Sequence, residues 1–177
     1  TKEGLIRANI VAKSLVEHDI IVVSGLAAGI DTMAHKTAIE NGGHTIAVLG
    51  TPLSKAYPKQ NSDLLNLIKQ DHLAISQFPE GYPSQPKNFP IRNRTMALIT
   101  DATIIIEAGE KSGTRHQGWE ALRLGRELYI LENVANDPKI SWAKEKMEYG
   151  AQSLSRENID LILEDIPYLT SKLEDAF

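Results

Sequence analysis

Residues able to bind an anion lie where a predicted strand runs into a Gly/Ala-rich turn, Ser24–Asp31. The turn opens a helix, so its backbone amides, with the positive end of the helix dipole behind them, would form a site for a phosphate. The glycines follow a GxxxG spacing, and the GxGxxG fingerprint of dinucleotide sites is absent from the turn. Close packing of a helix on a sheet explains the same glycines without a ligand. The candidate binding residues here are Ser24, Gly25, Ala28 and Gly29.

A second candidate site is the start of a predicted helix within Asn88–Arg94. Pro90 suits the first turn of a helix, and the two arginines that follow it flank an asparagine. Arginine forks match phosphates, and Phe89 can stack on a base. Positive charge at a helix N-terminus opposes the dipole, so an anionic partner would explain the arginines; a solvated helix start is the alternative. The candidates here are Phe89, Arg92, Asn93 and Arg94.

Two further turns carry weaker signals. Glu107–Thr114 again joins a strand to a helix through a glycine turn, and its hydroxyls and free amides offer a place for a phosphate. An ordinary turn with a hydroxyl N-cap explains it as well. The loop over residues 51–58 contributes Tyr57, either a stacking platform or a lid over the core. The candidates in the glycine turn are Lys111, Ser112, Gly113 and Thr114.

No set of residues predicts catalysis or metal binding. The chain has no cysteine, and its five histidines show no metal-ligand spacing. Ser24 and His35 as nucleophile and base are disfavoured because the sequence lacks a GxSxG elbow, and we expect His35 to face a helix neighbour or a backbone group. We therefore expect no catalytic group, no metal and no cofactor.

The elements that position these turns alternate between strand and helix along 177 residues, a length that predicts one domain. Short β-branched runs are typical of strands buried on both faces, and apolar residues elsewhere recur at helical spacing. This rhythm predicts an α/β fold, a doubly wound, mostly parallel sheet with helices on both faces. The predicted helices are Lys2–His18, Ile30–Asn41, Asn61 or Ser62 to Gln70, Ile91–Thr100, Thr114–Leu124, Asp137–Tyr149 and Glu157–Leu163. The predicted strands are Ile20–Val23, Thr45–Leu49, Leu73–Ser76, Ala102–Glu107, Glu127–Leu131 and Gln152–Leu154.

Charge is distributed unevenly along this domain. The net charge is −4, yet residues 1–150 are neutral, with 17 acidic and 17 basic side chains. Residues 87–126 carry seven basic and four acidic side chains, which permits a local basic groove. We expect one domain over 1–166 and an acidic tail or short helix over 167–177, with a first strand before Thr1. No apolar run approaches a membrane span and the N-terminus shows no signal core, so a cytoplasmic protein without membrane contact is expected.

Taken in order, the motifs in the turns that follow the predicted strands resemble those of the DNA-processing protein A family (DprA, also called Smf). The likeness covers about residues 5–165, and the family's first strand, with its Gly-Ser-Arg signature, would precede Thr1. The matching motifs are Ser-Gly-Leu-Ala-Ala-Gly-Ile-Asp at 24–31, Gly-Gly-His-Thr-Ile-Ala-Val-Leu-Gly at 42–50, Phe-Pro-Ile-Arg-Asn-Arg at 89–94, Glu107-Ala108, Lys-Ser-Gly-Thr at 111–114, Gly125-Arg126 and Gly150-Ala151.

The resemblance implies a Rossmann-like domain that binds and protects single-stranded DNA and is not an enzyme. It also implies loading of a RecA-type recombinase during natural transformation or DNA uptake, and a homodimer. The candidates of the first three turns would line the DNA pocket, with Arg92 and Arg94 on phosphates and the Gly25–Gly29 turn on backbone or base. The alternative is a nucleotide-binding sensor or a nucleoside-monophosphate phosphoribohydrolase of the wider superfamily, in which Glu120 would act beside the 112–114 turn and Arg94 would hold the phosphate.

Overall fold

Within the residues described by the computed structural model, 1–110, 112–164 and 166, six strands alternate with helices. The elements are α1 (Lys2–Glu17), β1 (Val22–Ser24), α2 (Ile30–Glu40), β2 (Thr45–Leu49), the 3-10 turn η1 (Lys59–Asn61), α3 (Ser62–Asp71), β3 (Leu73–Ser76), α4 (Asn88–Ile99), β4 (Ala102–Ile105), α5 (Thr114–Arg123), β5 (Glu127–Leu131), α6 (Glu132–Ala135), α7 (Ser141–Glu148), β6 (Gln152–Leu154) and α8 (Ile159–Glu164). The tail expected over 167–177 lies outside the described residues.

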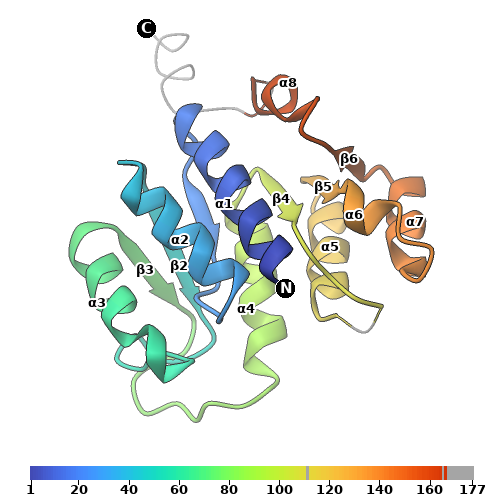
Figure 1. The fold of residues 1–177 in the computed structure, drawn as a ribbon. Coiled ribbons are helices and arrows are strands. Elements are labelled where there is room, and N and C mark those ends of the chain that lie inside the picture. Colours follow the sequence, from blue (N-terminus) through green and yellow to red (C-terminus); the bar gives the residue numbers. More distant parts are fainter. Residues whose placement is uncertain (111, 165, 167–177) are drawn as a thin grey trace, which may run out of the picture.

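The strands form two parallel sheets with three strands each in the described part of the chain, ordered β1-β2-β3 and β4-β5-β6. Val23 of β1 pairs with Ile46 of β2, and Ile104 of β4 pairs with Tyr129 of β5. Figure 1 shows α1 and α2 in front of the strands and α4 and α5 behind them. The predicted α/β fold with parallel strands and helices on both faces is therefore confirmed, and its strands fall into two hydrogen-bonded sets.

The described residues of β1 and β4 form no strand pair with each other, and helices α1 and α4 contact elements of both halves. On one face α1 packs along α2, while its Val11 lies in the core cluster that contains Tyr129 and Leu154 of the second sheet. On the other face α4 contacts both β2 and α5. We call this junction between β1 and β4 the seam.

Strand β5 shows how the core is divided. Leu128 and Ile130 point to one face and pack with Trp142 of α7, whereas Tyr129 and Leu131 point to the other and pack toward α1 and α8. This alternation is what a strand buried on both faces must do, because successive side chains leave a strand on opposite sides. The apolar run that predicted this strand is thus explained by two separate core clusters.

Three helix starts differ from the prediction, those of α4, α7 and α8, the last of which begins at Ile159 rather than Glu157. The helix expected from Asp137 begins at Ser141, because Asp137 forms a turn of its own in which Oδ1 accepts from the Lys139 amide at 2.8 Å. Helix α4 begins at Asn88 rather than Ile91, with Pro90 in its first turn, where a missing N–H leaves no helical bond unmade. The four-residue helix α6 was not predicted, since one turn is too short to show helical periodicity.

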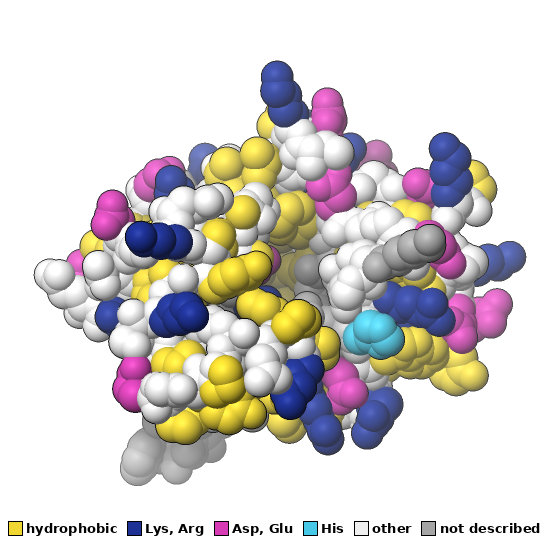
Figure 2. Space-filling model, turned by 90° about the horizontal axis from the view of Figure 1, so that it is seen from below, with side chains coloured by type: hydrophobic (Ala, Val, Ile, Leu, Met, Phe, Trp, Pro, Cys, Tyr) yellow, Lys and Arg dark blue, Asp and Glu magenta, His cyan; other side chains and the backbone are white. Residues whose placement is uncertain are grey.

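The turns that follow the strands gather on one face of the molecule, which we call the strand-end face. Parallel neighbours end at the same edge, so the predicted turn after β1 and the 51–58 loop after β2 share one edge, and the predicted turn after β4 lies at the corresponding edge of the second sheet. Figure 2 views this face and shows hydrophobic side chains near its centre with Lys and Arg side chains around them. Among the described residues, no helix is both long enough and apolar enough to cross a bilayer.

Candidate nucleic-acid interface

The turn after β1, residues 24–31, which we call the first turn, has an unfavourable backbone conformation that side chains outside the turn stabilise. Leu26 has a φ of 61° and Gly29 a φ of 90°, in the left-handed region that glycine adopts freely and leucine does not. The leucine strain, about 1–2 kcal/mol, is offset because its side chain is fully buried in the core and its carbonyl oxygen accepts from Asn61 Nδ2 at 2.9 Å. Asp31 closes the turn, its Oδ2 accepting from the Ala27 amide at 3.1 Å.

Part of this turn faces solvent. Ala28 and Gly29 are exposed, Ser24 is half-buried, and Gly25 is buried. Helix α2 starts at Ile30 with Gly29 as its N-cap, so no side chain caps its first amides. The Ala27 and Thr32 amides are already bonded, to Asp31 Oδ2 and to the Ala27 carbonyl oxygen, which leaves the Ile30 and Asp31 amides at the start of α2 as candidates for binding an anion.

Arg92 lies beneath the turn rather than on the surface. It is only 6% exposed, and its Nη1 donates to the carbonyl oxygens of Gly25, just after β1, and of Val48 in β2, the latter at 3.2 Å. A Cβ at position 25 would overlap the guanidinium, so this approach requires glycine there. Burial lowers the pKa of Arg92 and nearby Asp31 raises it. A phosphate contact by Arg92 stays a prediction; in this structure the side chain joins the ends of two strands.

His35 is fully buried and links α2 to the first sheet. Its Nδ1–H donates to Thr45 Oγ1 at 2.6 Å, and that hydroxyl donates to the Val22 carbonyl oxygen at 2.8 Å. Burial lowers the pKa of His35 to about 4, an effect that Asp31 and the Ser24 backbone partly offset. The ring is therefore neutral at pH 7. The sequence predicted a helix neighbour or a backbone group beside this ring, and the structure adds the threonine of the next strand.

Phe89 and Tyr57 form an aromatic pair at the edge of the 51–58 loop. Their ring centroids lie 5.1 Å apart with a 43° angle between planes, and Tyr57 is 56% exposed. The Phe89 ring packs so closely on Gly50 that a Cβ there would collide with it, and Arg92 Cζ lies 5.9 Å from the ring centroid. Tyr57 thus presents an open ring that Phe89 supports from the protein side.

Asn88 was not among the predicted site residues, yet it holds this region together. It is fully buried, and its Nδ2 donates to the carbonyl oxygens of Gly50 and Pro83, both at 3.1 Å. It therefore ties the proline-rich loop over 77–87 to the residue that follows β2. Asn61 plays a similar part for the first turn. Neither asparagine stands in a spacing that marks a buried anchor, so the sequence did not predict this role for them.

Arg94 is the exposed arginine of the segment Asn88–Arg94 at the start of α4, which we call the second turn. Its side chain is 57% exposed, and its Nε lies 3.4 Å from Glu120 Oε2 on α5. Glu120 also pairs with Arg123 at 3.3 Å. Asn93 beside it is half-buried. This contact joins the second turn to α5 while leaving the Arg94 side chain accessible, and it occupies the glutamate that the alternative phosphoribohydrolase would need as a free base.

The turn over Glu107–Thr114, which we call the third turn, is hydrogen-bonded to α7. Trp142 Nε1 donates to the Gly109 carbonyl oxygen at 3.2 Å, and Glu110 accepts from the amide and the hydroxyl of Ser141 at 2.9 and 2.7 Å. Ser112 Oγ donates to Thr114 Oγ1 at 2.9 Å, and Gly113 is exposed as the N-cap of α5. This is the hydroxyl-bearing turn that the sequence predicts; Lys111 lies outside the described residues.

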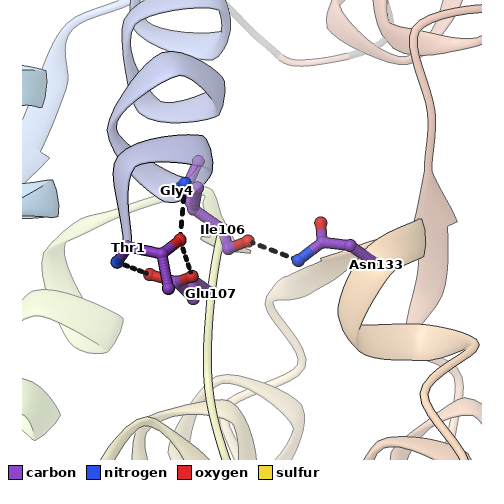
Figure 3. Close-up of polar contacts among 5 residues, drawn as sticks. All are labelled: Thr1, Gly4, Ile106, Glu107 and Asn133. Atoms are coloured by element: carbon purple, nitrogen blue, oxygen red, sulfur yellow. Dashed lines mark hydrogen bonds and ion pairs between the residues drawn. The ribbon is translucent and has the colours of Figure 1, made fainter.

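The N-terminal end of helix α1 lies at the same face. The Glu107 carboxylate, which follows β4, accepts hydrogen bonds from the Thr1 hydroxyl and the Thr1 amino group, and Thr1 Oγ1 accepts from the Gly4 amide at 3.0 Å (Figure 3). Asn133 Nδ2 donates to the neighbouring Ile106 carbonyl oxygen at 3.4 Å. The Thr1 contacts hold the Glu107 carboxylate and lower the pKa of its side chain.

The predicted residues fall into three turns that share the strand-end face. Arg92 joins the second turn to the first, and Arg94 joins the second turn to α5, which begins at the third turn. The described residues contain no group of three or more His, Cys, Asp or Glu side chains arranged to hold a metal ion. The face carries the free amides of Ile30 and Asp31, the hydroxyls of the third turn, the accessible Arg94 and the exposed Tyr57 ring.

Comparison with known proteins shows the family to which the chain belongs. The sequence model of a family described as DNA recombination-mediator protein A matches residues 1–167. The DNA processing protein DprA of Streptococcus pneumoniae is 40% identical over 137 residues, which are 77% of this chain and 49% of that protein. Its counterpart in Bacillus subtilis is 31% identical over 170 residues, 96% of this chain and 56% of that protein. The chain thus spans about half the length of these relatives.

Solved structures show the same kinship. The X-ray structure of DNA processing protein A from Streptococcus pneumoniae matches with a TM-score of 0.84 and 33% identity, covering 95% of this chain and 58% of that one. The protein of the same name from Helicobacter pylori, described for its single-stranded DNA binding mode, matches with a TM-score of 0.80 and 26% identity, covering 94% and 77%. A molybdenum cofactor carrier protein from Chlamydomonas reinhardtii, at 19% identity and a TM-score of 0.61, shares the fold alone. From its motifs, its fold and these relatives, the chain belongs to the DNA recombination-mediator protein A family.

Proposed function

We propose that this chain binds single-stranded DNA across its strand-end face. The observation that carries the proposal is the meeting of three turns there, with open amides at the start of α2, the exposed Arg94, and the exposed Tyr57 ring supported by Phe89. Positive charge follows a DNA backbone, and aromatic rings stack on its bases, so the two together suit a single strand. The Helicobacter pylori relative, described as a single-stranded DNA binder, supports this assignment.

The residues divide into two roles. Arg94, the exposed backbone of Gly113 and the half-buried hydroxyls of Ser112 and Thr114 would contact phosphates. Arg92 would act as a positioning residue, since its Nη1 is already bonded to the Gly25 and Val48 carbonyl oxygens. The protein would work as a binder in the cytoplasm without a catalytic step. Loading of a RecA-type recombinase in natural transformation, and homodimer formation, are further parts of the proposal that rest on the family resemblance.

The test is fluorescence anisotropy of a labelled oligothymidine against a duplex with the same label. We expect single-strand binding that weakens by roughly one to two decades between about 50 and 200 mM salt, because three or four phosphate contacts each add about −0.7 to the salt slope. Duplex binding should be much weaker, since paired bases cannot stack on the exposed ring. Absence of single-strand binding at about 50 mM salt would refute the proposed function.

Arg94 gives the sharpest single-residue test of the face. Replacing Arg94 by alanine should weaken oligothymidine binding about three- to tenfold and make the salt slope shallower by about 0.7, because one phosphate contact is lost. Lys13 is a matched control: it is 55% exposed and pairs with Glu17 at 3.7 Å, yet lies near the far end of α1. Lys13→Ala should leave both quantities unchanged, and an equal loss in the two variants would argue for nonspecific charge.

A further inference from the structure

A surface with aromatic and basic side chains on α5 and α7 lies beside the predicted site, and none of its residues belongs to the proposed DNA-binding set. We call it the α5–α7 surface and define it by Arg115, Trp119 and Tyr149. The rings of Trp119 and Tyr149 meet edge to face with centroids 5.1 Å apart. Tyr149 is 66% exposed, although a large aromatic ring gains most from burial. An exposed ring braced by a second ring is a feature that a ligand would explain.

Trp119 is held in place from inside by a buried lysine. Lys146 of α7 is fully buried, its Nζ lies 4.4 Å from the Trp119 ring centroid and 5.1 Å from that of Trp142, and it has no hydrogen-bond partner among the described residues. Gly118 makes room for the lysine stem, since a Cβ there would collide with it. Burial lowers the pKa of Lys146 to about 8, so the amine is still charged at pH 7 and its cation–π contact holds the indole.

Basic side chains on α5 lie before and after Trp119, while the exposed Glu145 and Glu148 lie beside Tyr149 on α7. Arg115 and His116 are exposed one helical turn before Trp119, and Arg123 is exposed one turn after it. Arg115 follows the third turn directly, so the surface continues from Ser112–Thr114 along α5. Figure 2 shows basic side chains, a histidine and hydrophobic side chains side by side on the right of the strand-end face, where Figure 1 places α5 and α7.

We propose that the α5–α7 surface is a second base-stacking platform, which binds nucleotides of a single strand that has passed the third turn. Tyr149 and Trp119 would stack on bases while Arg115 contacts the intervening phosphate. Stacking on a protein ring tolerates any base, so the platform would lengthen the binding site without adding sequence preference. The inference rests on the proposed function, because it extends the path of the same DNA strand.

The test compares labelled oligothymidines of about 6 and about 20 nucleotides, a range that spans one to two typical binding sites. Tyr149→Ala should weaken binding of the longer probe about five- to thirtyfold, as expected for one lost stacking contact, and should affect the shorter probe far less. Tyr149→Phe should restore most of the loss because the ring returns. Leu161→Ala, at a residue 67% exposed on α8, is the control for a change on another exposed surface.

Tryptophan fluorescence provides an independent readout. The chain has two tryptophans, and Trp142 is only 1% exposed, so quenching by the longer oligothymidine should come from Trp119 and disappear in Trp119→Phe. Wild-type binding without quenching, or an equal effect of Tyr149→Ala on both probes, would overturn the platform and leave the proposed function standing. If the wild type binds neither probe, the proposed function itself fails.

Discussion

Gly25→Ala should destabilise the fold by roughly 3 kcal/mol, which corresponds to a fall in melting temperature of about 6–12 °C for a chain of this size. The added Cβ would overlap the Arg92 guanidinium, whose side chain is only 6% exposed. Arg92 would have to give up the Gly25 and Val48 carbonyl oxygens, leaving buried polar groups unpaired. Thermal and urea unfolding measure the loss, and oligothymidine binding should weaken with it because the first turn is displaced.

A double-mutant cycle separates this collision from a general effect of alanine. In an Arg92→Ala background the Cβ has room, so Gly25→Ala should cost less than about 1 kcal/mol there, giving a coupling energy of about 2 kcal/mol. Gly109 is a second control: it follows β4 in the third turn, and a Cβ on it meets nothing within 4 Å, so Gly109→Ala should be nearly neutral. Equal costs of Gly25→Ala in both backgrounds would show that Arg92 does not require glycine.

Acidification should destabilise the protein through His35. Its pKa in the folded state is about 4 against 6.5 for an ordinary histidine, so the unfolded chain binds the proton more readily. The stability is therefore complete above pH 6.5 and falls as the pH drops toward 4, by about 3 kcal/mol in total. Urea unfolding between pH 7 and pH 4 measures this slope.

The His35→Gln variant isolates that contribution from other titrating groups. Glutamine does not titrate, so the difference in stability between wild type and variant should shrink as the pH falls from 7 to 4. The lowered pKa values of Glu107 and Glu110 also make the protein less stable in acid, but both groups remain in the variant and cancel in the difference. A difference that stays constant over this range would show that His35 takes up no proton on unfolding.

Much of the fold was predictable because its signals are local. The β-branched and apolar runs identified the described strands, and glycines after Asn41 and Leu124 marked helix ends, since these elements are set by periodicity and by turn chemistry. The division into two sheets was not predictable, because strand pairing depends on how distant segments pack. For the candidate site, the sequence located the turns that follow the strands, whereas the side-chain contacts that shape these turns were missed.

Arg92 illustrates why those contacts were missed. Its sequence context, an arginine near a helix start, is the same as that of Arg94, and both fit a phosphate equally well. Only the packing of α4 against the first sheet separates the two, burying one beneath Gly25 and leaving the other on the surface. Sequence reasoning therefore named both arginines as candidates and could not decide which of them holds the protein together.

The seam between β1 and β4 gives the proposed ligand a mechanical role. With no hydrogen-bonded ladder across the seam in the described residues, α1 and α4 are the joints between the two halves. The first turn lies on one side of the seam, and the third turn with α5 lies on the other. A DNA strand bound on both sides of the seam would restrict motion of the two halves relative to each other. Binding of the strand and stiffening of the protein would therefore occur together.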